Sequence, residues 1–341
     1  MKYVFSLVLV LVLPATAASA GPQPVRRQQQ AMGTLVEITV YTDDEPRALA
    51  AMDAAFAEFS RLEGLMTDWR EDSTIGRLNA AAGDGRWIAL DPDTDKVVAK
   101  SIDTSRLTGG AFDVTVGVFR GLWKFDRDID QTLPSPAAVR ERRRLVGWRD
   151  LLYDPARRAA RLRRPGQRIT LGGIAKGYAV DRATEKLRAS GLRDFMVQAG
   201  GDFFASGHHG DRPWRVGIRD PRGPREQFFA FLEVYDQSFS TSGDYERFVL
   251  RDGRRYHHIL DPKTGFPAMR SRSVTVLAPN AFEADALDTA LFVLGPQRAL
   301  ALLRRERPGI EAVIVDAQNR VQTTAALRNR LVWVGHPTDA P

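Results

Sequence analysis

Residues 169–181, ITLGGIAKGYAVD, place two glycines between a short apolar run and a segment with helical periodicity. The pattern favours a strand at 169–171, a turn at Gly172-Gly173 and a helix over 174–190. Glycine has no Cβ and a helix N-terminus presents free N–H groups, so a phosphate can approach such a turn closely. Lys176, one turn into the helix, could pair the phosphate charge. A tight strand-to-helix turn with a surface lysine would give the same pattern.

A second informative stretch is HILDPKTG at residues 258–265. It sets His258 beside a rigid Asp-Pro and a Thr-Gly turn, which suits an acid/base group with a pKa of about 6–7 on a fixed loop. A structural histidine that bonds a backbone carbonyl is the alternative. A serine hydrolase built from STSG at 240–243 and His258 has little support, since no G-x-S-x-G elbow exists. The two stretches together indicate chemistry on a phosphate-containing ligand.

Acidic residues recur on one predicted helix, residues 281–294. Asp288 and Thr289 follow Asp285 by three and four positions, so all three share one face of the helix. Carboxylate and hydroxyl oxygens are the ligands of a hard cation such as Mg²⁺. An acidic start that complements the helix dipole, with Thr289 as a buried filler, would look the same.

Composition and termini bound the class of protein. The 341 residues are 43% hydrophobic and 27% charged, as in a globular enzyme, and the net charge of +7 is mild. No aromatic interleaving or known module accompanies the arginine clusters, so nucleic acid is not an expected partner. Lys2, an apolar run and Ala18-Ser19-Ala20 predict a signal peptide over 1–20, with an uncleaved anchor as the alternative. Without cysteine there is no disulfide or lipid anchor, so we expect a periplasmic mature chain without a transmembrane segment.

The remaining pattern predicts a single compact domain over 32–335, preceded by a flexible leader at 21–31 and followed by a tail at 336–341. Its class is α+β (mixed α/β), with mixed sheets flanked by helices, because helical segments alternate irregularly with short strands. We expect helices at 45–66, 91–109, 174–190, 281–294 and 297–305. Strands are expected at 34–41, 195–199, 203–206, 214–218, 228–234, 239–241, 246–250, 273–277, 311–315 and 331–334.

Several motifs occur in an order that resembles one family, the ApbE-type FAD:protein FMN transferases. The similarity extends from about Met32 to Gly295. It rests on MGT at 32–34, GAFD at 110–113, LGGIAKGYAVD at 171–181, GGD at 200–202, WRVGI at 214–218, STSG at 240–243, HILDPKTG at 258–265 and EAD…TA at 283–290.

This resemblance implies that FAD is cleaved at its pyrophosphate and that FMN passes to a Thr or Ser hydroxyl of a partner protein, releasing AMP. It implies catalytic roles for His258 and Asp285. Mg²⁺ would be held by Asp285, Asp288, Thr289 and the carbonyl of Gly173. The flavin nucleotide would contact Met32, Trp69, Ala111, Phe112, Asp113, Thr170, Gly172, Lys176, His258 and Leu260.

One difference from the family concerns Thr170, which stands where many members carry an aspartate. Threonine can bond a ligand but has no charge, so we expect an effect on FAD affinity or selectivity. The resemblance also suggests that the acceptor is a membrane redox subunit with a short Thr-containing motif. An FAD pyrophosphatase that yields FMN and AMP, or a periplasmic flavin-binding protein without turnover, are the alternative functions.

Overall fold

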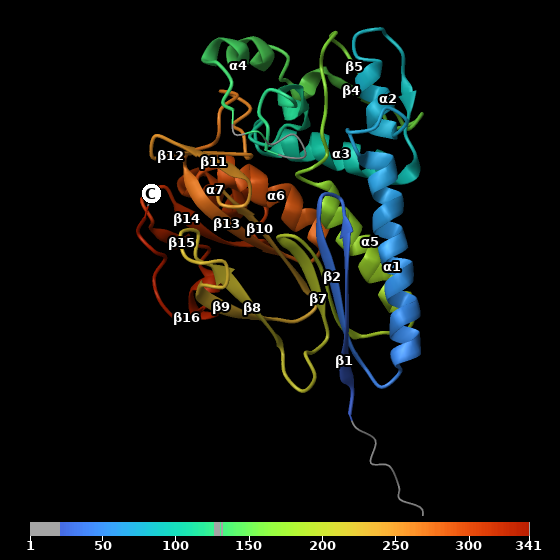
Figure 1. The fold of residues 1–341 in the computed structure, drawn as a ribbon, viewed down its shortest axis with the longest axis vertical. Coiled ribbons are helices and arrows are strands. Elements are labelled where there is room, and N and C mark those ends of the chain that lie inside the picture. Colours follow the sequence, from blue (N-terminus) through green and yellow to red (C-terminus); the bar gives the residue numbers. More distant parts are fainter. Residues whose placement is uncertain (1–20, 126–129, 131, 341) are drawn as a thin grey trace, which may run out of the picture.

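The computed structural model describes residues 21–125, 130 and 132–340 (Figure 1). The predicted signal peptide lies outside these residues. An antiparallel eight-stranded sheet runs through the molecule. Its strands, in spatial order, are β1 (Gln23–Ala31), β2 (Thr34–Thr42), β6 (Asp194–Ala199), β7 (Asp202–Ser206), β10 (Gln237–Gly243), β13 (Ser271–Ala278), β14 (Glu311–Asp316) and β15 (Val321–Thr323).

Three smaller antiparallel groups accompany this sheet. They are β3 (Ile88–Ala89), β5 (Ala159–Leu162) and β4 (Leu151–Asp154); β16 (Val332–Trp333), β9 (Phe228–Val234) and β8 (Trp214–Arg219); and the hairpin β11 (Phe248–Arg251) with β12 (Arg254–His257). The helices are α1 (Glu45–Met66), α2 (Thr74–Ala80), α3 (Pro92–Leu107), α4 (Pro136–Arg143), α5 (Ala175–Ala189), α6 (Ala281–Leu294) and α7 (Pro296–Glu306). Short 3₁₀ turns occur at η1 (Val114–Phe119), η2 (Trp148–Asp150) and η3 (Ala326–Asn329).

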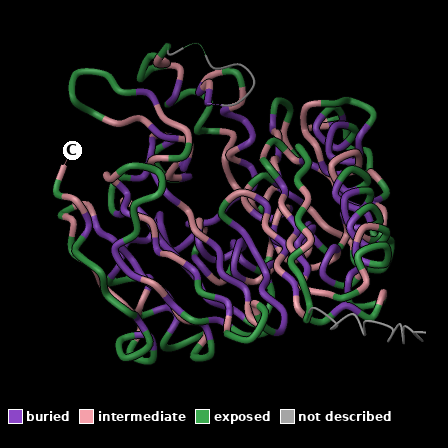
Figure 2. Tube along the Cα trace, turned by 60° about the horizontal axis from the view of Figure 1, so that its bottom comes forward, coloured by how far each residue is buried: buried purple, intermediate pink, exposed green. Residues whose placement is uncertain are grey.

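The central sheet has a core on each face. Val274 and Val276 of β13 pack with residues of α6 and α7, whereas Leu277 packs with the β8–β9 sheet. Side chains alternate across a strand, so neighbouring residues of β13 enter different cores. Figure 2 shows buried residues concentrated in the interior of the molecule and exposed residues in its outer loops. The α+β class expected from the sequence is confirmed.

The predicted flexible leader is wrong for residues 23–31. They form β1, which pairs with β2 along its whole length, from Gln23 opposite Thr42 to Ala31 opposite Thr34. Met32 and Gly33 connect the strands with φ angles of 51° and 70°, the positive values of a two-residue hairpin turn. The polar side chains of residues 26–30, RRQQQ, suit an edge strand. Because they lack the apolar alternation of a typical strand, the sequence did not predict one here.

Helix starts agree closely with the sequence. Asp44, Ser73 and Asp91 accept backbone N–H bonds at the starts of α1, α2 and α3. The predicted bounds of 45–66, 281–294 and 228–234 are those of α1, α6 and β9. Among the described residues, none of the helices has the length and apolar character that a membrane span requires.

Candidate active site

A cavity of about 720 Å³ lies where the β1–β2 turn, η1, the start of α5, β7, β10 and α6 meet. Its lining includes every site residue predicted from the sequence: Met32, Trp69, Ala111, Phe112, Asp113, Thr170, Gly172, Gly173, Lys176, His258, Leu260, Asp285, Asp288 and Thr289. Residues more than 250 positions apart in the chain therefore form one site.

The segment 169–173, which carries the two glycines, is held by hydrogen bonds to residues that do not belong to a sheet. Both backbone groups of Ile169 bond the side chain of Asn79, at 2.8 Å for the N–H and 3.0 Å for the carbonyl. Thr170 N–H donates to the carbonyl of Val114 at 2.9 Å. A Cβ on Gly117 would lie 2.6 Å from the Ile169 carbonyl carbon, so the two backbones touch. The predicted strand at 169–171 is wrong, because these backbone groups bond a side chain and a 3₁₀ turn instead of a strand.

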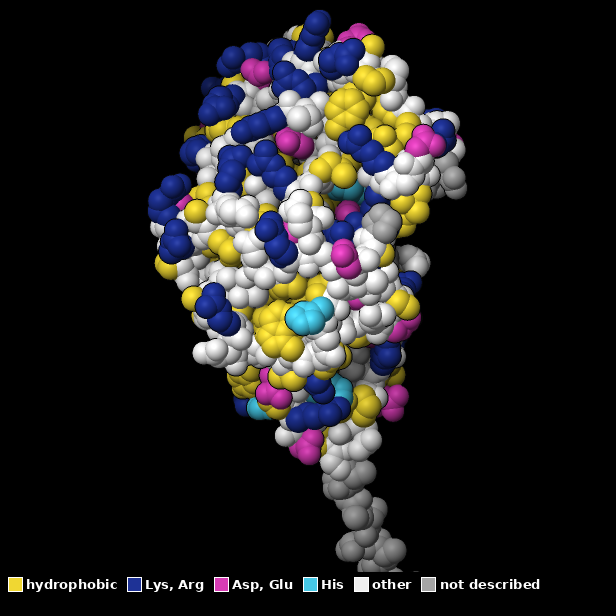
Figure 3. Space-filling view, turned by 90° about the vertical axis from the view of Figure 1, so that its left-hand side faces the viewer, with side chains coloured by type: hydrophobic (Ala, Val, Ile, Leu, Met, Phe, Trp, Pro, Cys, Tyr) yellow, Lys and Arg dark blue, Asp and Glu magenta, His cyan; other side chains and the backbone are white. Residues whose placement is uncertain are grey.

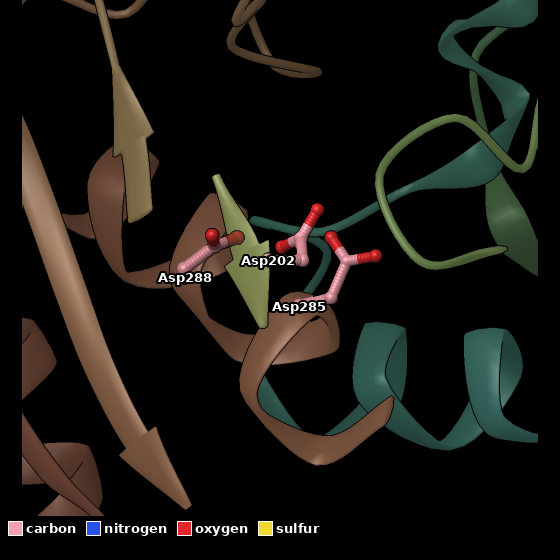
Figure 4. Close-up of side chains that lie close together, drawn as sticks. All are labelled: Asp202, Asp285 and Asp288. Atoms are coloured by element: carbon pink, nitrogen blue, oxygen red, sulfur yellow. The ribbon is translucent and has the colours of Figure 1, made fainter. Parts of the chain in front are cut away.

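Three buried carboxylates form the floor of the cavity: Asp202 at the start of β7, and Asp285 and Asp288 on α6 (Figure 4). One oxygen of each lies within 4.8 Å of the others. Lys176 forms an ion pair with Asp202 and lies 3.6 Å from Oδ1 of Asp285. The alternative of a surface lysine therefore does not hold.

Burial and mutual repulsion set the charges of this acid cluster. Burial, followed by the charge of Asp202, raises the pKa of Asp285 to about 7. Burial and the charge of Asp285 raise the pKa of Asp288 well above its ordinary value. Burial alone would lower the pKa of Lys176, but Asp202 and Asp285 outweigh it and raise the value. The acidic groups therefore resist ionising together beside one ammonium, and a bound cation would favour their ionised forms.

The donor chemistry of the cluster fits a hard divalent cation. Ser240 Oγ bridges the carboxylates of Asp202 and Asp288, at 2.7 Å from the latter. Thr289 Oγ1 lies 3.1 Å from Asp288 Oδ1, and a Cβ on Gly173 would lie 3.5 Å from the same hydroxyl. Among the described residues, the ligand atoms that converge here are oxygens, as Mg²⁺ prefers. Asp285 Oδ2 also accepts the Gly177 N–H at 2.7 Å, which fixes α6 against α5.

The two adjacent histidines have different environments. His257 is buried, with Nε2 2.8 Å from the Ala268 carbonyl and Nδ1 accepting the Ile259 N–H at 3.3 Å. His258 lines the cavity, and its buried Nδ1 has no hydrogen-bond partner among the described residues. Burial, then the charge of Arg247, lowers the pKa of His258 to about 3. The imidazole of His258 is therefore neutral near pH 7 in this structure, and an apparent pKa of about 6–7 for the transfer rate stays a prediction.

Aromatic and charged side chains line the part of the cavity near Trp69, Met32 and Asp113. The Arg120 guanidinium lies 3.7 Å from the centre of the Trp69 ring, a stacked arrangement. Met32 N–H donates to Glu63 Oε2 at 2.8 Å. Asp113 accepts backbone N–H bonds from Thr115 and Trp148, both at 2.9 Å. The carboxylate of Asp113 therefore anchors the loops around η1 as well as lining the site.

Sequence reasoning missed several lining residues that carry charge or hydrogen bonds. The most important is Asp202, which stood in the GGD turn but could not be placed opposite α6 without the sheet. The others in the lining are Glu63, Asp68, Arg120, Glu246 and Arg247. Ser240, which bonds Asp202 and Asp288, was also missed. A carboxylate that follows two glycines at a strand start was the one signal available for Asp202.

Comparison with known proteins shows which family the chain resembles. The family model described as ApbE matches residues 32–314. The FAD:protein FMN transferase of Treponema pallidum is 35% identical over 95% of this chain and 94% of its own length. That of Klebsiella pneumoniae is 30% identical over 89% of this chain and 88% of its own length.

Solved structures agree with these relatives. The ApbE protein of Thermotoga maritima superimposes with a TM-score of 0.81, at 33% identity over 90% of this chain and 99% of that one. The flavin transferase ApbE of Vibrio cholerae gives 0.80, at 28% identity over 91% and 99%. The chain belongs to the ApbE family.

Proposed function

We propose that this protein transfers FMN from FAD to a hydroxyl group of a partner protein and releases AMP. The observation that carries the proposal is the shared cavity, which brings His258, the Gly172-Gly173 segment and the acid cluster together. The names of the relatives in the ApbE family give the same reaction. The cavity volume of about 720 Å³ is in the range of cofactor sites.

In the proposed reaction an oxygen of the acceptor attacks the phosphorus on the FMN side of the FAD pyrophosphate. A new P–O bond forms, the bond to the AMP phosphate breaks, and AMP leaves with the electron pair. His258 would receive the hydroxyl proton, a role supported by its neutral imidazole in the lining of the cavity. Gly172 and Gly173, before the uncapped first turn of α5, allow the pyrophosphate to approach the backbone.

We further propose that Mg²⁺ is held by Asp285, Asp288 and Thr289, with Asp202 added from the structure. When bound, the ion would neutralise charge that develops on the phosphate oxygens. Support comes from the convergence of buried oxygen ligands. Lys176, held by Asp202, would contribute a second positive charge at the same place.

The acceptor and the compartment are also part of the proposal. The N-terminal signal pattern supports a periplasmic location. A Thr or Ser of a membrane redox subunit is the acceptor that the family resemblance favours. Candidate acceptors are those with a short Thr-containing motif exposed on the same side of the membrane.

An acceptor-dependence experiment tests the function. Enzyme, FAD and Mg²⁺ are incubated with and without a candidate acceptor, and AMP is quantified by chromatography. We expect AMP to be formed in step with flavin bound to the acceptor. Equal AMP release without acceptor would favour the pyrophosphatase, and unchanged FAD in both samples would favour a flavin-binding protein.

A further inference from the structure

A second cavity of about 290 Å³ lies beside the hairpin β11–β12, away from the acid cluster. Its lining is rich in arginine: Arg222, Arg254, Arg255 and Arg272, with Asp244 as the one carboxylate among the described lining residues. Figure 3 shows Lys and Arg side chains gathered over the upper part of the face on which this hairpin lies in Figure 1. The proposed reaction uses none of these arginines.

The single carboxylate of this arginine cavity is already engaged. Arg222 donates to both oxygens of Asp244, at 2.7 and 2.8 Å, and only 7% of each side chain is exposed. Buried Asp220 accepts the Arg222 N–H at 3.0 Å and the Thr338 N–H at 2.9 Å, which fixes the loop that carries Arg222. The bidentate pair is therefore rigid, and Asp244 has little charge left for the other three arginines.

The positive charges of Arg254, Arg255 and Arg272 are not fully balanced by carboxylates. Arg255 lies 3.9 Å from the centre of the Phe248 ring, and Arg272 donates to Asn319 Oδ1 at 3.1 Å. Within the described part of the chain, no carboxylate forms an ion pair with Arg254 or Arg255. Arg272 has Asp339 at 3.8 Å, but that aspartate is 87% exposed.

Burial and the neighbouring positive charge both act on two of these groups. Burial, followed by the charge of Arg222, lowers the pKa of both Arg255 and Arg272. Burial also lowers the pKa of His257 to about 4, so the histidine adds no charge. Four arginines line a cavity whose described lining holds one carboxylate, already engaged by Arg222, and a bound anion would relieve the repulsion between them.

We propose that the arginine cavity is a binding site for a phosphate-type oxyanion, either inorganic phosphate or a phosphate monoester. Planar guanidinium groups match the oxygens of a phosphate in a bidentate geometry. The volume of 290 Å³, less than half that of the first cavity, admits such a group but not a whole dinucleotide. The proposal does not depend on FMN transfer, because it concerns binding to other residues.

Titration calorimetry with inorganic phosphate at constant ionic strength tests the site, and glycerol 3-phosphate in a parallel arm distinguishes a free from an esterified phosphate. We expect Arg255→Gln to weaken binding by about tenfold or more, the usual effect of a charged hydrogen-bond donor. Asp244→Asn should tighten binding, since it removes the competing carboxylate. Arg304→Gln on the exposed face of α7 is the matched control and should bind as the wild type does.

Two further measurements locate the bound anion. Saturating FAD should leave the phosphate affinity unchanged, and phosphate should slow amide hydrogen exchange in residues 254–257. Absence of phosphate binding at millimolar concentration would overturn the proposal. So would binding that is unaltered in Arg255→Gln and Asp244→Asn but lost in Lys176→Met, because the anion would then occupy the first cavity.

Discussion

Nζ of Lys176 lies 3.6 Å from Oδ1 of Asp285 and pairs directly with Asp202. Within the described residues it is the one cation that forms an ion pair with the acid cluster. Lys176 thus offsets part of the negative charge of the carboxylates that we propose as Mg²⁺ ligands. Cation and lysine should stabilise the same carboxylates.

Lys176→Met should therefore destabilise the metal-free protein by roughly 3 kcal/mol, because it leaves buried carboxylates without their ion-pair partner. Mg²⁺ should recover more stability in this variant than in the wild type. Thermal unfolding with EDTA and with Mg²⁺ measures both effects, and Lys263→Met on the exposed loop is the control. A variant as stable as the wild type without Mg²⁺ would contradict this role of Lys176.

Asp202→Asn tests the carboxylate that sequence reasoning missed. It removes one charge and keeps the shape, so Mg²⁺ affinity should fall roughly 10–100-fold, as when a group supporting a metal site is lost. Calorimetric titration with Mg²⁺ measures the change, with exposed Asp252→Asn as an isosteric control. Unchanged affinity in Asp202→Asn would place the cation elsewhere.

His257 should make the fold sensitive to acid. Its folded pKa of about 4 lies below the unfolded value of 6.5, so the unfolded chain binds the extra proton first. The contribution of His257 is complete above pH 6.5 and is lost as the pH falls toward 4. Between pH 7 and pH 5 this amounts to about 2 kcal/mol.

Urea unfolding at the two pH values gives the measurement. His257→Gln should be less stable at pH 7 but should lose less stability than the wild type on acidification. His258, whose pKa is also lowered by burial, remains in both proteins and contributes equally. An equal acid loss in wild type and variant would show that His257 does not titrate in this range.

Helices α5 and α6 pack so closely at Gly177 that an added methyl group should not fit between them. A Cβ on Gly177 would lie 2.2 Å from the Ala281 carbonyl oxygen, so Gly177→Ala should cost about 1–3 kcal/mol and displace Asp285. Gly64→Ala in α1 meets no atom within 4 Å and should stabilise by about 0.5–1 kcal/mol. Chemical unfolding of both variants checks the pair. Equal effects of the two substitutions would exclude a packing role for Gly177.

Local patterns predicted most of the elements, and the family resemblance supplied most of the expected site residues. The shared face of Asp285, Asp288 and Thr289 follows from helical periodicity, which is a local property. The motifs around Gly172 and His258 predicted residues that now line one cavity. Their roles in binding and catalysis remain predictions that the variants above address.

Features that depend on distant partners could not be predicted. The β1 strand forms because β2 supplies its hydrogen bonds, although its sequence is polar. Asn79 holds Ile169 across 90 positions, and Asp202 meets α6 only through the order of strands in the sheet. The low pKa of His258 likewise depends on burial and on Arg247, neither of which local sequence reveals.

The most direct test of the account is the intact mass of an acceptor protein incubated with enzyme, FAD and Mg²⁺. We predict a mass gain equal to FMN less one water, on a Thr or Ser, with wild-type enzyme. His258→Ala should bind FAD yet form this product about 10²–10⁴-fold more slowly, the usual contribution of proton transfer. An acceptor that gains no flavin mass with wild-type enzyme, or one modified equally fast by His258→Ala, would contradict the account.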